Sequence, residues 1–259
     1  MTVGGSASAL SASTVGLPLA SILARRAGGA DGPAGPCQTG NVQDPRRALA
    51  RSRLYLICDA QPDAFLHAAL RGGVDIVQLR AKHVGDDEIV AAGRRYAAVC
   101  ARHGALLIIN DRPDLVDATG ADGVHVGQDD VAIEQARRDV GPNRIVGLST
   151  HSPAQIDAAG ELADVDYIGV GPIHATPTKP GRPAVGLELV RYAAAHAAIP
   201  FFAIGGVDST NAAAVHTAGA RRIAVVRALT QAGDPEVAAA TLRAAIGTPR
   251  ARGAGVGAT

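Results

Sequence analysis

Two aspartates and three basic residues are the side chains of this sequence best suited to metal-assisted chemistry on a phosphorylated substrate. Asp111 and Asp130 each follow a short apolar run, and Arg80, Lys82 and Lys179 follow others. Carboxylate oxygens are suitable ligands for octahedral Mg²⁺, with water and phosphate oxygens completing the shell. Clustered cations repel one another unless an anion neutralises them, so a diphosphate is the expected ligand. Asp130 could instead cap a following helix, and any one cation could be a solvated surface charge.

A second group of residues is suited to binding a phosphate through backbone N–H groups. Gly205 and Gly206 follow an apolar run, where glycine permits close approach of a phosphate, although a tight turn would also account for the pair. Val226 and Arg227 would add further N–H groups. The segment 176–179 carries two hydroxyls and an ammonium on a proline-stiffened loop, which suits either a second anion or an ordinary rigid turn.

Ser149 also ends an apolar run, and two histidines stand near such ends. No Gly-x-Ser-x-Gly pattern surrounds Ser149, so a hydrogen bond to a heterocycle is favoured over a nucleophilic role. His125 could line a pocket, but a histidine at the end of an apolar run is more often a structural residue. His151 is equally compatible with a solvent-facing position.

Short apolar runs that alternate with helix-like segments must position these residues. Continuous apolar runs are typical of parallel strands buried on both faces of the sheet. Eight repeats favour an α/β fold of the (β/α)8 barrel type, a TIM barrel, over a doubly wound open sheet of about five or six strands. In such a barrel the strand ends named above meet at one mouth. The runs span 54–58, 75–79, 106–109, 123–126, 145–149, 167–170, 201–204 and 223–226.

The chain of 259 residues is predicted to contain a single catalytic domain between two tails. Residues 1–50 are rich in Ala, Gly and Ser and lack a periodic apolar pattern, which predicts a disordered extension. The barrel is expected over residues 51–247, and the Gly- and Ala-rich residues 248–259 are expected to form a flexible tail. The proline-rich segment 171–186 is predicted to be a binding loop or lid.

Composition argues against several classes of protein. The chain has 25 basic and 24 acidic residues, and this balance argues against a general nucleic-acid or anionic-membrane binder. Aromatic residues are 3% of the chain with no Trp, so a stacking platform for single strands is not expected. No apolar run is long enough to span a membrane. Three widely separated cysteines predict neither a zinc site nor a disulfide framework, which favours a cytoplasmic location. Taken together, these features predict an enzyme that acts on small molecules. A homo-oligomer is left open.

Seven motifs, in this order, resemble the motif series of thiamine phosphate synthases across about residues 54–246. They are QLRAK at 78–82, INDR at 109–112, GADGVHVGQDD at 120–130, GLSTH at 147–151, GVGP at 169–172, TPTK at 176–179 and AIGG at 203–206. The resemblance implies a (β/α)8 barrel that joins 4-amino-2-methyl-5-pyrimidinylmethyl diphosphate to 4-methyl-5-(2-phosphoethyl)thiazole and releases pyrophosphate.

The resemblance also implies a role for each matching residue. Asp111 and Asp130 match the Mg²⁺ ligands. The residues that match the pyrimidine diphosphate site are Gln78, Leu79, Arg80, Ala81, Lys82, Asn110, Ser149 and Lys179, and the catalytic ones among them would be Arg80, Lys82, Ser149 and Lys179. The residues that match the thiazole phosphate site are Thr176, Pro177, Thr178, Gly206, Val226 and Arg227. This chain departs from the family at Ala81, where an acidic residue is usual, and at Arg227, where a small residue is usual.

The implied chemistry needs charge stabilisation more than proton transfer. An aminopyrimidine stabilises positive charge on its exocyclic CH2, so the diphosphate can leave before the thiazole nitrogen attacks. That nitrogen carries no proton, so no general base is required. Two alternatives remain open: a related thiazole tautomerase, which would not need the cluster of cations and aspartates, and a non-catalytic sensor of phosphorylated metabolites.

Overall fold

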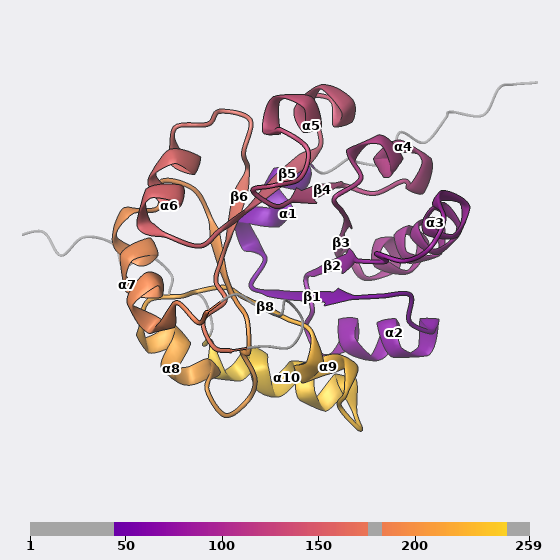
Figure 1. Cartoon of the computed structure of the whole chain (residues 1–259). Coiled ribbons are helices and arrows are strands. Elements are labelled where there is room, and N and C mark those ends of the chain that lie inside the picture. The colour runs from indigo at the N-terminus through magenta and orange to yellow at the C-terminus, as the bar shows by residue number, and fades with distance from the viewer. Residues whose placement is uncertain (1–43, 176–182, 248–259) are drawn as a thin grey trace, which may run out of the picture. The chain divides into compact units, whose positions relative to one another are not determined.

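Eight parallel strands form a closed barrel in the computed structural model, which describes residues 44–175 and 183–247 (Figure 1). Each strand pairs with the next in the sequence, and β8 closes the ring against β1. This confirms the predicted (β/α)8 barrel. The strands are β1 (Leu54–Cys58), β2 (Ile76–Leu79), β3 (Leu106–Asn110), β4 (Gly123–Val126), β5 (Ile145–Thr150), β6 (Tyr167–Val170), β7 (Phe201–Ile204) and β8 (Ile223–Val225).

Helices follow the strands and surround the barrel. They are α2 (Asp63–Arg71), α3 (Asp86–His103), α4 (Val116–Thr119) after the short 3₁₀ turn η1 (Pro113–Leu115), α5 (Ile133–Val140), α6 (Pro153–Gly160), α7 (Gly186–His196), α8 (Ala212–Thr217), α9 (Arg227–Thr230) and α10 (Pro235–Ala245). Local sequence fixes several ends. The Ser152 and Asp234 side chains accept backbone N–H bonds at the starts of α6 and α10, and Gly104 ends α3 in the left-handed conformation. Within the described ranges no helix is both long and apolar enough to cross a membrane.

Alternate residues of each strand face the inside of the barrel and the surrounding helices. The outward residues join a core cluster with the helices, as Leu54, Leu56 and Cys58 do on β1. The inward residues form a second cluster that includes Tyr55, Ile57 and aromatic or aliphatic side chains from the other strands. This alternation decides which strand residues can reach a pocket at the mouth of the barrel.

Aspartates stabilise the amino-terminal end of the barrel in a repeating pattern. Asp75, Asp122 and Asp166 directly precede β2, β4 and β6. Their carboxylates accept backbone N–H bonds from the start of β1, β3 and β5, at 2.7–3.0 Å. Arg222 has the equivalent position before β8 and instead donates to backbone carbonyls just before β1. Backbone groups at this end are thus satisfied by side chains from neighbouring strands.

A helix before the barrel, α1 (Pro45–Arg51), closes the same end. Its Leu49 is 3% exposed and belongs to the cluster inside the barrel. Arg46 donates to the Asp166 carboxylate at 2.6 Å and to a carbonyl before β5. The predicted boundary of the extension at residue 50 is therefore wrong, since residues 45–50 are helical. The sequence signal was slight: one buried apolar residue and an Asp44–Pro45 helix start.

Candidate active site

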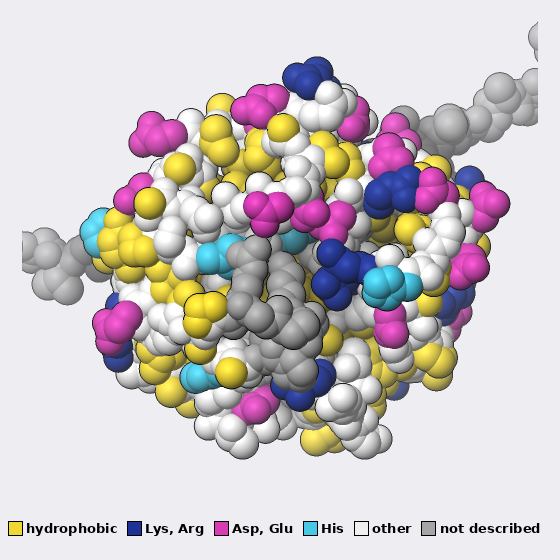
Figure 2. Space-filling model, in the orientation of Figure 1, with side chains coloured by type: hydrophobic (Ala, Val, Ile, Leu, Met, Phe, Trp, Pro, Cys, Tyr) yellow, Lys and Arg dark blue, Asp and Glu magenta, His cyan; other side chains and the backbone are white. Residues whose placement is uncertain are grey.

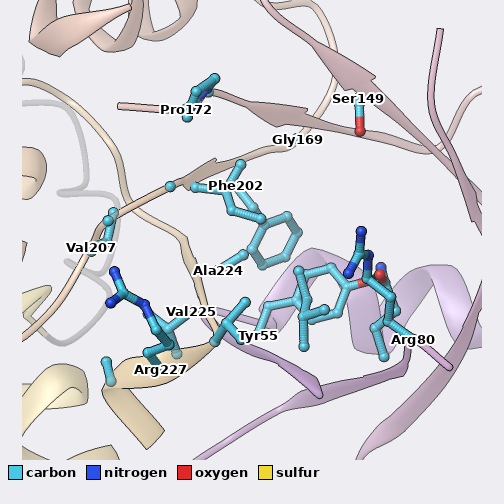
Figure 3. Close-up of a pocket in the computed structure, with 18 of the residues that line it drawn as sticks. Tyr55, Arg80, Ser149, Gly169, Pro172, Phe202, Val207, Ala224, Val225 and Arg227 are labelled. Carbon is cyan, nitrogen blue, oxygen red and sulfur yellow. The ribbon is translucent and has the colours of Figure 1, made fainter. Parts of the chain in front are cut away.

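A pocket of about 310 Å³ lies at the carboxyl-terminal mouth of the barrel. Figure 3 shows Arg80 and Arg227 on opposite sides of this pocket, with the rings of Tyr55 and Phe202 between them. On the face of the molecule drawn in Figure 2, basic, acidic and histidine side chains gather near its centre. The pocket therefore offers a cation at each side of an apolar, aromatic floor. The predicted substrate-binding residues that line it are Gln78, Arg80, Asn110, Ser149, Gly206, Val226 and Arg227.

Three of the predicted binding residues that the structure describes, Leu79, Ala81 and Lys82, do not line the pocket. Leu79 is 1% exposed and its side chain belongs to the cluster between the strands and the helices. Ala81 packs against the same cluster. Because strand residues alternate between the two faces, Leu79 cannot share the inward direction of Gln78, and only its backbone is available to a ligand. The predicted residues Thr176, Pro177, Thr178 and Lys179 lie outside the described residues.

Lys82 and Asp111 lie side by side, in an ion pair that was not predicted from the sequence. The Lys82 ammonium lies 2.9 Å from the Asp111 carboxylate, and both side chains remain partly exposed. Asp111 has a φ of 60°, in the left-handed region that few residues other than glycine adopt. Its N–H donates to the His125 carbonyl at 2.8 Å, which continues the pairing of β3 with β4 for one more residue. Backbone strain is thus retained beside Lys82, as is common at functional sites.

Asp130 belongs to a tight turn after β4. Its carboxylate accepts the Gly127 N–H at 2.9 Å. The alternative that it caps a helix is wrong, because α5 begins at Ile133 and Ala132 stands at the capping position. Since β3 and β4 are neighbours in register, this turn and Asp111 extend adjacent strands.

The donor chemistry of these aspartates fits magnesium bound partly by substrate. Among the described residues, no cluster of three or more His, Cys, Asp or Glu side chains could hold a metal ion. A dedicated protein cage is therefore not present in that part of the chain. Mg²⁺ is commonly held by one or two carboxylates together with phosphate oxygens and water, and Asp111 and Asp130 provide carboxylates of this kind.

Ser149 is held from two directions. Its carbonyl accepts the Gln128 amide N–H at 2.7 Å, and its hydroxyl is 3.0 Å from His125 Nε2. His125 lines the pocket, so it is more than the purely structural residue that the sequence favoured. His151 also lines the pocket, where its Nδ1 lies 2.5 Å from the Gly171 carbonyl oxygen.

Buried hydrogen bonds continue inward from Ser149. His125 Nδ1 is 3.0 Å from the Tyr167 hydroxyl, which is 2.9 Å from the Tyr55 hydroxyl. The Gln78 side-chain amide donates to Tyr55 at 2.6 Å. Burial raises the pKa of both phenols above the ordinary value, so both remain protonated at neutral pH. Gln78, a predicted binding residue, is thus linked to Ser149 on the other side of the pocket.

Gly147, on the inner face of the barrel, makes room for this network. Gly147 pairs directly with Tyr167 across β5 and β6, and a methyl group there would overlap the Tyr167 ring. At Gly169, an added methyl group would lie 3.5 Å from the His125 ring. Gly205 and Gly206 have positive φ and pack closely against residues 172–175, so the tight turn itself requires glycine. Gly206 nevertheless lines the pocket as well.

Reasoning from the sequence missed the aromatic residues of the pocket. Tyr55, Tyr167 and Phe202 contact one another edge to face, with ring centroids 5.3–6.0 Å apart. Each stands in an apolar run, where it was read as ordinary core. The hydroxyl groups of Tyr55 and Tyr167 could have identified them in the sequence, because a tyrosine hydroxyl inside a barrel needs a hydrogen-bond partner.

Comparison with known proteins agrees with this geometry. Residues 54–229 match a family model described as thiamine monophosphate synthase. The thiamine-phosphate synthase of Saccharopolyspora erythraea is 49% identical over 214 residues, which cover 78% of this chain and 96% of the relative. That of Thermobifida fusca is 48% identical over 204 residues, covering 76% and 94%.

Solved structures give the same result. Thiamine phosphate pyrophosphorylase from Pyrococcus furiosus is 32% identical with a TM-score of 0.69, and the match covers 78% of this chain and 96% of that one. A 3-hexulose-6-phosphate synthase, 24% identical with a TM-score of 0.54 over 74% of this chain and 99% of that one, shows the fold alone. On the extent of the family match and the identity to these relatives, this chain belongs to the thiamine monophosphate synthase family.

Proposed function

We propose that this chain is a thiamine phosphate synthase, a transferase that condenses 4-amino-2-methyl-5-pyrimidinylmethyl diphosphate with 4-methyl-5-(2-phosphoethyl)thiazole. The products are thiamine phosphate and pyrophosphate. Family membership supports this activity, and one observation in the pocket carries it: cations stand at opposite sides of an aromatic floor. Two phosphorylated heterocycles that react with each other need two anion sites and an apolar surface between them.

The reaction follows from the charge of these groups. The bond between the exocyclic CH2 and the diphosphate oxygen breaks, and its electron pair leaves with pyrophosphate. The thiazole nitrogen then donates its lone pair to that carbon, so no proton needs to be removed. Arg80 and Lys82, with the predicted Lys179, would stabilise the negative charge on the departing pyrophosphate. Ser149 would orient the pyrimidine ring through a hydrogen bond.

Magnesium is proposed as the second source of positive charge. Asp111 and Asp130 would hold it, and when bound it would act as a Lewis acid on the diphosphate. The ion pair of Lys82 with Asp111 supports this assignment, because it places the Asp111 carboxylate beside a predicted diphosphate-binding cation. Both side chains are partly exposed, so the pair itself contributes little to stability and can rearrange around an anion.

The remaining roles are proposed on the same basis. Gly206, Val226 and Arg227 would bind the thiazole phosphate, together with the predicted Thr176–Thr178 segment. Substrates are then small molecules, and the balanced charge of 25 basic and 24 acidic residues supports a cytoplasmic enzyme that binds neither nucleic acid nor membrane.

A reconstitution with purified components tests the proposal. The protein is mixed with both phosphorylated heterocycles, with and without Mg²⁺, and thiamine phosphate and pyrophosphate are quantified. We expect both products in equal amounts, and only with the metal. A thiazole tautomerase or a sensor would release no pyrophosphate, and that result would overturn the proposal.

Single substitutions then test the site. Asp111→Ala and Lys179→Ala should each lower turnover by about 10²-fold or more, comparable to the loss of one oxyanion donor. Asp117→Ala is a matched control, because Asp117 also forms an ion pair, with Arg144, but stands on α4 and is 79% exposed. Wild-type turnover in both site variants would refute the proposed roles.

A further inference from the structure

A continuous line of hydrogen bonds crosses the inside of the barrel from β2 to β5. It runs from Gln78 through Tyr55, Tyr167 and His125 to Ser149, with successive distances of 2.6, 2.9, 3.0 and 3.0 Å. We call it the tyrosine chain. We infer that Tyr167 is a positioning residue, which fixes the tautomer of His125 and thereby makes the Ser149 hydroxyl a hydrogen-bond donor to the substrate.

The Gln78 side chain sets the direction of hydrogen-bond donation along the tyrosine chain. This side chain is 1% exposed and its amide nitrogen, which can only donate, faces the Tyr55 hydroxyl. A phenol has one proton, so Tyr55 accepts from Gln78 and donates to Tyr167. Tyr167 in turn accepts from Tyr55 and donates to His125 Nδ1. The polarity of the whole line is then set by one amide group.

The direction of donation determines which ring nitrogen of His125 carries the proton. With Nδ1 accepting from Tyr167, a neutral His125 ring carries its proton on Nε2. That N–H donates to Ser149 Oγ, which is 3.0 Å away. Ser149 Oγ therefore receives a hydrogen bond from inside the barrel, and its own proton is directed into the pocket that it lines.

Packing around the tyrosine chain leaves little freedom for other arrangements. Gly147 leaves the space that the Tyr167 ring fills. Gln128 holds the Ser149 backbone carbonyl at 2.7 Å. A buried polar network is costly unless each member is satisfied, and a fully satisfied one holds a single geometry. Packing alone would not require tyrosine at positions 55 and 167, because phenylalanine fills nearly the same volume.

The consequence rests on the proposed function. The ring nitrogens of an aminopyrimidine have lone pairs and no proton, so they accept hydrogen bonds only. A hydroxyl can bind one of these ring nitrogens only as a donor, which is the role that the tyrosine chain gives Ser149. Tyr167, two hydrogen bonds away, would thus affect binding of the pyrimidine substrate without touching it through its hydroxyl.

Nitrogen NMR of histidine-labelled protein tests the tautomer without any substrate. The ¹⁵N shifts of neutral imidazole distinguish Nε2–H from Nδ1–H, and the spectrum of His125→Asn identifies the resonances of His125. We expect the Nε2–H form in the wild-type protein. Tyr55→Phe interrupts the line between Gln78 and Tyr167, so it should weaken the preference for that form. Tyr167→Phe should give a mixture of the two tautomers. A wild-type Nδ1–H form or imidazolium would overturn the inference, even if Tyr167→Phe does not fold.

Steady-state kinetics give the second readout. In Tyr167→Phe the KM for the pyrimidine diphosphate should rise about 3- to 10-fold, the range expected for one neutral hydrogen bond, while the KM for the thiazole phosphate stays within about 2-fold. Tyr192→Phe is the control, because its hydroxyl bonds only to Asp157 on the outside among the described contacts. Equal changes in both KM values would indicate general loss of structure and refute the positioning role. Failure of the wild-type protein to make thiamine phosphate would instead refute the proposed function, and the NMR result would stand apart from it.

Discussion

Replacement of Gly147 by alanine should destabilise the barrel through a single neighbour. Gly147 is paired in register with Tyr167, and a methyl group there would overlap the phenol ring and lie 2.5 Å from its hydroxyl oxygen. Strand β5 is hydrogen-bonded on both sides, to β4 and β6, so its backbone cannot easily retreat. The side chain of Tyr167 must move instead.

The cost can be worked out from these contacts. Overpacking a dense core costs about 1–3 kcal/mol. Displacement of the phenol also weakens its bonds to Tyr55 and His125, each worth about 1 kcal/mol. Reduced freedom of the unfolded chain returns about 0.4–1 kcal/mol for a Gly→Ala change. We therefore expect a net loss of about 2–4 kcal/mol in the free energy of unfolding, a large fraction of a typical domain stability.

Urea unfolding of four proteins measures this loss: wild type, Gly147→Ala, Tyr167→Leu and the double variant. Leucine removes the ring atoms that collide with the added methyl group, so Gly147→Ala should cost less than about 1 kcal/mol in that background. The coupling energy should then be at least about 1 kcal/mol. Gly233→Ala is the control, because an added methyl group there meets no atom within 4 Å. Gly147→Ala within about 0.5 kcal/mol of wild type, or an equal cost in both backgrounds, would refute the reasoning.

Three further outcomes are expected. Leu49→Ala should lower the free energy of unfolding by about 2–5 kcal/mol, because this buried side chain fills the end of the barrel, and urea unfolding checks it. Burial raises the pKa of Asp122 above 3.8, so the folded state holds this proton more tightly and the associated stability is lost as pH rises through the raised pKa. Wild type should therefore gain stability relative to Asp122→Asn when the pH is lowered from 7 toward 4, and parallel curves would contradict this. Lys82→Ala should lower turnover about 10²-fold while Lys82→Met does no better, as measured by pyrophosphate release.

The architecture was predictable because each buried strand is a short continuous apolar run in the sequence. Eight apolar runs predicted the barrel, and the polar residues that follow them were expected at one mouth. That step needs only the rule that parallel strands end at one mouth. The left-handed turn at Asp111 gave no such signal, since aspartate adopts many other backbone conformations.

Features that depend on contact between distant segments were not predictable. Which residues of a run face inward is set by the closure of the barrel, so Leu79 was grouped with Gln78 although their side chains lie on opposite faces. The bond between Tyr55 and Tyr167 joins residues 112 apart in the sequence and depends on how β1 and β6 face each other. Helix α1 was missed because its stability comes from Leu49 and Arg46 in tertiary contact, with little local preference to reveal it.

Helix α1 also bears on how substrates enter the barrel and how products leave it. Because Leu49 packs into the cluster inside the barrel at the amino-terminal end, the described pocket opens at the other end, where substrates enter and products leave. A pyrophosphate or thiamine phosphate that remains bound in the pocket blocks binding of the next substrate. Product release is the step that limits turnover in many enzymes, and this arrangement makes it the step to measure here.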